Sequence, residues 1–548
     1  MASSCLPASL ASAQPSAREE ALLAPASGGA LRGGAAVAID GSYVLVGVPG
    51  TGTAATRGTV YIYHRTAAAT WELEQTLADP EPSSTNTGDM FGSSVALVGT
   101  TAIVGDPGHA SMAGQAWIVT RGGGTPPWTA SRVAPPGGAP TRFGLAVAIA
   151  SRGASGSAIV IGAPDSGGGR AGAVFVFDDT GAILLPALTT PTAVAGSERF
   201  GAAVAVAADA STVSILVGAP EANTVYPATL SGTWMFGAPI RGPSTGKFGT
   251  SVALSTNGLV AAIGADEESS RGAAYGLVRT SLSTGWPDIG SAVALTATDT
   301  AASDHFGRSV AASPDAIVVG APNHDDPTSD SGSVYLFRPD ASGGGWHLAS
   351  RYHASTGTMG DLLGSSVAVS GATVVGGAPK ASATLGYAGV FPFPLEDGDA
   401  CTLAERCGSG FCVDDVCCEG ACGGGATDDC VACSIANGGT TDGACTAARE
   451  TMSCTACGMS GTCGAGTCST PAACDAGAVD VDSGVDAGGS TGGDGGVGMD
   501  GGTGPLHHVS GCKCEAGAAG GSPSVLALAL AGSLAAVRRR RRRAKEAC

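Results

Sequence analysis

Short apolar runs, separated by glycine, proline and small polar residues, recur along the first 396 residues of the chain. The best-preserved unit is Phe306–Phe337. In it a Phe-Gly pair precedes an alternating run, Gly-Ala-Pro follows a second run, and a glycine precedes a third. The runs are rich in Val and Ile and bounded by turn-forming residues, which predicts β-strands. This region shows no long apolar period of 3.6 residues, so we expect few helices.

The same order of marks occurs seven times. The first marks are Phe91-Gly92, Phe143-Gly144, Phe200-Gly201, Phe248-Gly249 and Phe306-Gly307, with Leu363-Gly364 and a degenerate Gly33-Gly34 completing the set. The second marks begin at Gly47, Gly105, Gly162, Gly218, Gly264, Gly320 and Gly377. Successive second marks are between 46 and 58 residues apart, a spacing that indicates one supersecondary unit per repeat.

Each unit reads as four antiparallel strands. The first two runs are joined tightly, as at Asp40-Gly41 and Asn257-Gly258, which are pairs favoured in two-residue hairpin turns. A third run follows, as in Thr59–Tyr63, and a fourth, Trp71–Leu77, leads towards the next Phe-Gly pair. Four-stranded units repeated radially form the blades of a β-propeller.

The two ends of the repeat region predict a closed ring. The last unit stops after its third run, Ala388–Phe393, and Glu19–Ala24 resembles the missing fourth strand. Donation of that strand would leave no open sheet edge. We therefore predict an all-β fold with a seven-bladed propeller over residues 18–396, closed by an N-terminal strand.

The two marks resemble FG-GAP repeats, the blades of the integrin α-subunit head and of many bacterial surface proteins. The resemblance covers about 70 % of the chain and implies a propeller used for binding rather than for catalysis. Many FG-GAP blades also carry an Asp-x-Asp-x-Asp-Gly calcium loop between their first two strands. Here those joints are a bare turn, as at Val98–Thr101 and Ser313–Asp315, or a neutral loop, Ala150–Ser157. Calcium requires six to eight oxygen ligands, so we predict no calcium site, no other metal and no cofactor.

The net charge and the lack of catalytic motifs in the sequence narrow the range of possible functions. A net charge of −18 over 548 residues argues against nucleic-acid binding. The eight histidines are scattered, without His-Glu-x-x-His or Gly-x-Ser-x-Gly arrangements, so we expect no enzyme. His64 and His305 are interpreted as packing or surface residues. The acidic loops Asn323–Asp330 and Asp266–Glu268 could hold a cation or ligand, but solvated loops are the favoured interpretation.

A second module spans residues 399–474. It has too few large apolar residues for a conventional core, so cross-links must hold it. Zinc is the alternative, because Cys430/Cys433 and Cys454/Cys457 have zinc-knuckle spacing. The even count and an adjacent cysteine pair favour disulfides, whose pairing the sequence leaves open. The module resembles Cys-rich modules of myxobacterial surface proteins. The predicted disulfide cysteines are Cys401, Cys407, Cys412, Cys417, Cys418, Cys422, Cys430, Cys433, Cys445, Cys454, Cys457, Cys463, Cys468 and Cys474.

The remaining segments are read as tails. Residues 1–17 are a disordered terminus or a truncated signal peptide, since Ala11-Ser12-Ala13 resembles a cleavage site without an apolar region before it. Residues 475–510, rich in Asp and Gly, are expected to form a flexible linker.

Residues 511–548 contain a Cys-Lys-Cys motif, an apolar run at Pro523–Val537 and six arginines, Arg538–Arg543. This layout resembles myxobacterial C-terminal sorting signals. The resemblance implies transient insertion in the inner membrane, cleavage by a sorting protease, and lipid-linked display with Cys512, or else Cys514, as the retained anchor. A basic nucleic-acid patch is the alternative for the arginines.

Together these features predict a non-catalytic protein at the cell surface, or outside the cell, whose propeller binds an unknown glycan, matrix component or protein. A structural envelope or matrix spacer without a specific ligand is the alternative. A hydrolase is the remote alternative, because it needs carboxylates or histidines converging on the inner strands, and the sequence shows none there.

Overall fold

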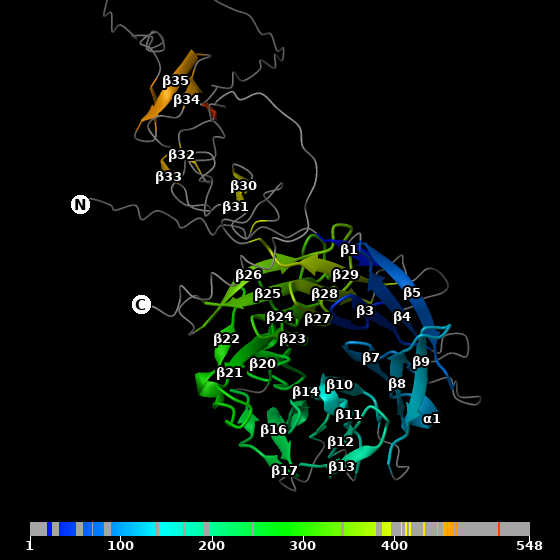
Figure 1. Ribbon diagram of the computed structural model, residues 1–548. Coiled ribbons are helices and arrows are strands. Elements are labelled where there is room, and N and C mark those ends of the chain that lie inside the picture. The colour runs from blue at the N-terminus through cyan, green and yellow to red at the C-terminus, as the bar shows by residue number, and fades with distance from the viewer. Residues whose placement is uncertain are drawn as a thin grey trace, which may run out of the picture. The chain divides into compact units, whose positions relative to one another are not determined.

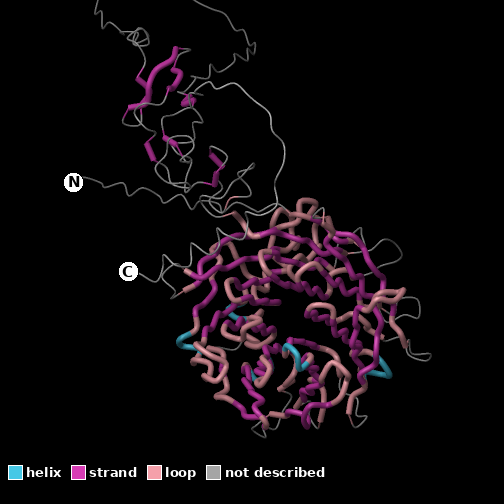
Figure 2. The backbone as a smooth tube through the Cα atoms, in the orientation of Figure 1, coloured by secondary structure: helices cyan, strands magenta, loops and turns pink. Residues whose placement is uncertain are grey.

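Strands dominate the part of the chain that the computed structural model describes (Figure 2). That part comprises residues 19–24, 32–50, 58–67, 70–81, 89–136, 142–167, 171–190, 198–243, 246–340, 345–379 and 386–395, followed by Cys407 and short strands up to Glu515. The helical elements described are one turn, α1 (His109–Met112), and the 3-10 turns η1 (Gly153–Ser155), η3 (Pro220–Ala222), η4 (Glu268–Ser270) and η5 (Ile289–Ser291). The all-β prediction is confirmed for these residues.

The strands up to Pro392 form seven antiparallel sheets, in which consecutive strands pair in chain order except for β18 (Ile240–Arg241) in the fourth sheet and the N-terminal strand in the seventh (Figure 1). Blade 1 contains β2 (Ala36–Asp40), β3 (Tyr43–Val48), β4 (Thr59–Arg65) and β5 (Trp71–Ala78). Blade 2 contains β6 (Ser94–Val98), β7 (Thr101–Asp106), β8 (Gln115–Arg121) and β9 (Trp128–Val133). Blade 3 contains β10 (Ala146–Ser151), β11 (Ser157–Ala163), β12 (Ala173–Phe177) and β13 (Ile183–Leu188). Blade 4 contains β14 (Ala203–Ala208), β15 (Val213–Ala219), β16 (Thr224–Ser231), β17 (Thr233–Phe236) and the short β18 (Ile240–Arg241).

The later blades repeat this plan. Blade 5 contains β19 (Ser251–Leu254), β20 (Val260–Ala265), β21 (Ala273–Val278) and β22 (Val293–Leu295). Blade 6 contains β23 (Ser309–Ser313), β24 (Ala316–Ala321), β25 (Ser333–Pro339) and β26 (Trp346–Tyr352). Blade 7 contains β27 (Ser366–Ser370), β28 (Thr373–Ala378) and β29 (Tyr387–Pro392), and its outermost strand is β1 (Ala21–Leu23).

The N-terminal strand closes the ring as predicted. β1 pairs antiparallel with β29, with Ala21 opposite Val390 and Leu23 opposite Ala388. Leu23 is buried among apolar side chains of blades 7 and 1. The first strands of adjacent blades also contact one another around the ring, and β27 returns to β2.

The two sequence marks allow the backbones of adjacent blades to pack directly against each other. In blade 6 the Gly307 amide donates to the Gly320 carbonyl at 3.0 Å, which joins the first and second strands. The α-carbon of Gly320 faces blade 7 so closely that a Cβ there would lie 2.0 Å from the carbonyl oxygen of Gly364. A Cβ on any of the seven second-mark glycines would likewise lie 2.0 to 2.1 Å from a first-mark glycine carbonyl of the next blade. Glycine is required because the backbones of adjacent blades touch.

The first-mark phenylalanines anchor the cores between sheets. Phe91, Phe143, Phe200, Phe248 and Phe306 are all 2 % exposed or less. The rings of the last four make edge contacts with aromatic side chains on the third strand of their blade, as between Phe306 and Tyr335. The blade-motif residues are therefore structural.

One predicted turn is wrong. Asp40-Gly41 begins a two-residue turn, since Asp40 pairs with Tyr43. Asn257-Gly258 lies in a longer loop, because the last strand pair is Leu254 with Ala261. The Asn257 side chain causes the difference: its Oδ1 accepts from the Leu259 amide and the Ser255 hydroxyl, which replaces a tight reversal with a turn of its own.

The chain divides into two units, and the propeller belongs to the first, which also contains β30 (Cys412–Val413) and β31 (Val416–Cys417). There Cys407 and Cys417 form a disulfide, and Cys412 is disulfide-bonded as well. The second unit contains β32 (Val431–Ala432), β33 (Thr446–Ala447), β34 (Ser453–Ala456), β35 (Met459–Gly464), β36 (Thr467–Ser469) and β37 (Lys513–Glu515). Its largest sheet has the order β36-β35-β34-β37.

These three cysteines are among the fourteen predicted to form disulfides, and the Cys-rich module as a whole stays a prediction. Cys454, Cys463, Cys468 and Cys514 lie on strands. Outside the described residues lie Cys512, the apolar run Pro523–Val537, the linker and the N-terminal segment. Among the residues that are described, no helix has the length and apolarity needed to cross a membrane.

Candidate functional site

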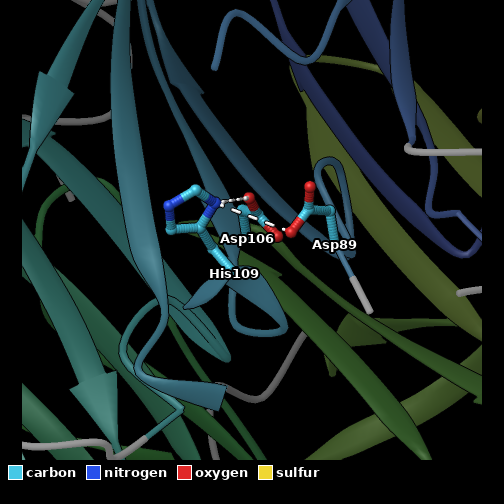
Figure 3. A group of neighbouring side chains, drawn as sticks. All are labelled: Asp89, Asp106 and His109. Carbon is cyan, nitrogen blue, oxygen red and sulfur yellow. Dashed lines mark ion pairs between the residues drawn. The ribbon is translucent and has the colours of Figure 1, made fainter. Parts of the chain in front are cut away.

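Blade 2 buries three side chains of metal-ligating type in one place (Figure 3). Asp89 precedes Phe91 by two residues, on the connection that enters the blade. Asp106 is the last residue of β7, where Pro107 ends the strand because it has no amide to donate. His109 lies in α1, on the turn from β7 to β8. The segment entering the blade and the turn after β7 thus converge on one point.

The imidazole of His109 makes no hydrogen bond to either carboxylate of the cluster. The Nδ1 atom of His109 is 3.6 Å from Oδ1 of Asp89 and 3.8 Å from Oδ2 of Asp106, both beyond hydrogen-bond distance. The exposed fractions are 1 % for Asp89, 0 % for Asp106 and 8 % for His109. His109 Nδ1 is buried, has no hydrogen-bond partner, and points at both carboxylates (Figure 3).

Neighbouring groups fix the orientation of Asp106. Its Oδ1 accepts from the Met90 amide at 2.7 Å, and its Oδ2 accepts from the Gln115 amide nitrogen at 3.1 Å. The other end of the Gln115 amide, Oε1, is buried without a hydrogen-bond partner. The carboxylate is held in place before any ligand arrives.

The electrostatics of this corner are unfavourable for its negative charges. Burial raises the pKa of Asp106, although its two hydrogen bonds oppose that rise. Asp79, at the end of blade 1, has its pKa raised to about 6, mainly by burial and further by the charges of Asp106 and Asp89. The imidazole Nδ1 of His109 lies within 4 Å of a carboxylate oxygen of both Asp89 and Asp106. The cluster is therefore rich in buried carboxylate.

Blade 6 carries the same positions with one difference. Asp304 corresponds to Asp89 and His324 to His109, counted from the two sequence marks. There the imidazole Nδ1 lies 2.8 Å from Oδ2 of Asp304, a direct hydrogen bond. The position of Asp106 is taken by Ala321 in blade 6, and by Val or Ala in each of the other blades. An acid directly after the second-mark glycine therefore occurs in blade 2 alone; in blade 6 the second acid near the histidine is Asp299, 3.9 Å from Nε2 of His324.

The two acidic loops singled out in the sequence differ in how far their acidic side chains are exposed to solvent. In the loop 323–330, Asp325 is exposed and Asp326 pairs with Arg351, which is consistent with a surface loop. The expectation of a solvated loop at 266–268 is wrong for two of its three acids. Asp266 is 3 % exposed beneath Arg308, and Glu268 is 9 % exposed where it accepts from the Tyr275 hydroxyl.

The two histidines predicted to pack or lie at the surface do so. The His64 ring lies 4.8 Å from that of Tyr43, and His305 is part-exposed beside the Asp266 carbonyl. Sequence reasoning did not find the cluster of Asp89, Asp106 and His109. A usable signal was present, because Asp106 replaces the small apolar residue that every other second mark has at that position.

Comparison with known proteins supports the repeat assignment. The family model described as FG-GAP repeat matches residues 71–119 and 290–337, which include the first two strands and most of the third strand of blades 2 and 6. The chain therefore carries FG-GAP repeats on a seven-bladed β-propeller. No curated protein matches the chain in sequence.

Among solved structures, the crystal structure of Saccharomyces cerevisiae Sqt1 matches with 11 % identity and a TM-score of 0.39. The match covers 67 % of this chain and 84 % of that one. A likeness of this size carries no argument about function.

Proposed function

We propose that the protein is a non-catalytic binding protein displayed outside the cell, whose propeller binds a polar ligand through the loops of one face. The observation that carries the proposal is the FG-GAP propeller itself, closed by β1. Cell-surface display is supported by the sequence layout of the tail, with Cys512 or Cys514 as the retained anchor and a sorting protease and membrane lipid as partners.

The lengths of the connections between the first three strands of each blade indicate which face binds. Adjacent antiparallel strands run in opposite directions, so connections from first to second strand emerge on one face and those from second to third strand on the other. On the first face, Ser313 and Ala316 are joined by two residues, as are Ser370 and Thr373. On the opposite face a much longer connection runs from Ala321 to Ser333. We call this second face the long-loop face, and binding residues are usually found on such loops.

The described part of the long-loop face is polar. Between blades 4 and 5 a surface hollow is lined by Glu221, Lys247 and Glu267, and Lys247 Nζ lies 2.7 Å from Glu267 Oε1. Charged and amide groups of this kind hydrogen-bond hydroxyl-rich ligands, which favours a glycan over an apolar partner.

The proposal is tested with the purified full chain. Labelled protein is applied to a glycan array and to whole cells, and saturable binding is expected. Glu267→Ala on the long-loop face should weaken that binding, whereas Asp179→Ala, an equally exposed acid on the opposite face, should leave it unchanged. Equal effects of the two substitutions would contradict the choice of face. An absence of saturable binding on both surfaces would favour the alternative, a structural envelope spacer.

A further inference from the structure

We propose that Asp89, Asp106 and His109 form a binding site for a divalent transition-metal ion that ties the segment entering blade 2 to the turn between β7 and β8. This proposal is independent of the ligand bound by the long-loop face. It rests on the geometry of the three side chains and on the comparison with blade 6.

The position of the His109 imidazole is that of a metal ligand. His109 is only 8 % exposed, and its Nδ1 faces two carboxylates without a hydrogen bond to either. In a tetrahedral zinc site with bonds of about 2.0 Å, neighbouring ligand atoms lie about 3.3 Å apart. The separations of 3.6 and 3.8 Å are close to that value, and the three ligand atoms all lie within 4.8 Å of one another.

Comparison of the histidine in blade 2 with that in blade 6 also favours a metal site. Blade 6 has Ala321 at the position of Asp106, and there the equivalent imidazole Nδ1 hydrogen-bonds Asp304 directly at 2.8 Å, while Asp299 lies 3.9 Å from the other ring nitrogen. In blade 2 the addition of Asp106 coincides with an imidazole that stands back from both acids. Ligands arranged around an ion have this spacing, whereas a simple His–Asp pair closes to hydrogen-bond distance.

The donor set selects the class of ion. One imidazole nitrogen with two carboxylate oxygens suits Zn²⁺, Mn²⁺ or Co²⁺, and of these zinc binds most tightly. Calcium prefers oxygen ligands only, so this is a different kind of site from the calcium loop of the repeat family. Two carboxylates also neutralise a doubly charged ion, and the amide of Gln115 orients one of them as an outer partner.

The test uses Asp106→Ala in the full, oxidised chain. This substitution restores the residue that most other blades have at the same position, so the variant should fold. After treatment with a chelator, Zn²⁺ at about 100 times its Kd should raise the unfolding midpoint of the wild type by roughly 5 °C. The midpoint of the variant should not respond. An equal response of both proteins would overturn the proposal, as would no response from the wild type.

Two further measurements separate this site from the cysteines. Co²⁺ should give the wild type a weak visible d–d spectrum without the intense charge-transfer bands of thiolate ligands, and Asp106→Ala should abolish it. Thiolate bands alone would assign the metal to the cysteines and overturn the proposal. Ala321→Asp beside Asp304 and His324 should add a second bound ion per chain. Stabilisation by Ca²⁺ but not by Zn²⁺ would refute the assigned class.

Discussion

The close backbone contact between blades can be tested by adding one methyl group. In Gly320→Ala the new Cβ would lie 2.0 Å from the Gly364 carbonyl oxygen and 2.4 Å from the Ser309 hydroxyl. Neither atom can retreat freely, because the Gly364 amide donates to Gly377 in its own blade and the Ser309 hydroxyl donates to the Gly364 carbonyl at 2.8 Å. Blades 6 and 7 must separate locally.

The magnitude follows from two contributions. Overpacking of a close contact costs about 1–3 kcal/mol. Separation of the blades also breaks the hydrogen bond from Ser309, which contributes about 1 kcal/mol. We expect the free energy of unfolding to fall by about 3 kcal/mol. At roughly 2 °C per kcal/mol for a domain of this size, the midpoint should drop by about 6 °C.

The assay is thermal and urea unfolding followed by circular dichroism, with Gly123→Ala as the matched control. Gly123 lies in a loop, and no atom comes within 4 Å of the place that a methyl group would take there, so the control should be neutral. Ser309→Ala in the Gly320→Ala background should not restore stability, because the carbonyl clash remains. A Gly320→Ala variant as stable as the control would refute the account of the repeat marks, and full rescue by Ser309→Ala would assign the clash to the serine instead.

Three further predictions concern closure, ionisation and cross-linking. Leu23→Ala should lower the free energy of unfolding by about 2–3 kcal/mol in urea titrations, and Leu22→Ala on the other side of β1 by less; equal losses would contradict the buried role of Leu23. Burial raises the pKa of Tyr63 to about 12 and raises those of Tyr275, Tyr335 and Tyr387 above their usual value of 10.0. The folded state then binds more protons than the unfolded chain above pH 10, so stability should fall as pH rises from there, and phenolate absorbance should appear together with unfolding rather than gradually near pH 10. Non-reducing peptide maps should show Cys407 linked to Cys417; recovery of either as a free thiol would contradict the structure.

The blade register was predictable because it depends on backbone contacts that only glycine permits. A requirement of this kind leaves the same residue at the same place in every unit, as with Gly320 and its six counterparts. The closing strand was predictable for a related reason. A blade that ends after β29 needs a fourth strand, and 19–24 was the one segment outside the repeats with a fitting pattern.

The candidate metal site was not predicted because its ligands are joined by irregular backbone. His109 is turned back towards β7 by α1, where Ala110, Ser111 and Met112 all have positive φ angles although none is glycine. Propensity rules give no warning of such a turn, since left-handed backbone costs about 1–2 kcal/mol per residue for these side chains. The spacing from Asp89 to Asp106 and His109 also matches no metal-binding motif.

Comparison of the repeats suggests how a group of ligand-binding side chains can arise in a propeller blade. The positions that pack adjacent blades together have nearly the same residue in every repeat. A polar residue at one of them is therefore noticed only when the repeats are compared with one another. Asp106 stands at a mark where the other blades have Val or Ala, and its burial would be costly without a compensating charge. Asp304 and His324 show that half of the cluster persists as an ordinary hydrogen-bonded pair where that residue is Ala. We therefore expect that a single substitution at a packing position can convert a structural His–Asp pair into a set of three converging ligands, and Ala321→Asp tests this step in blade 6.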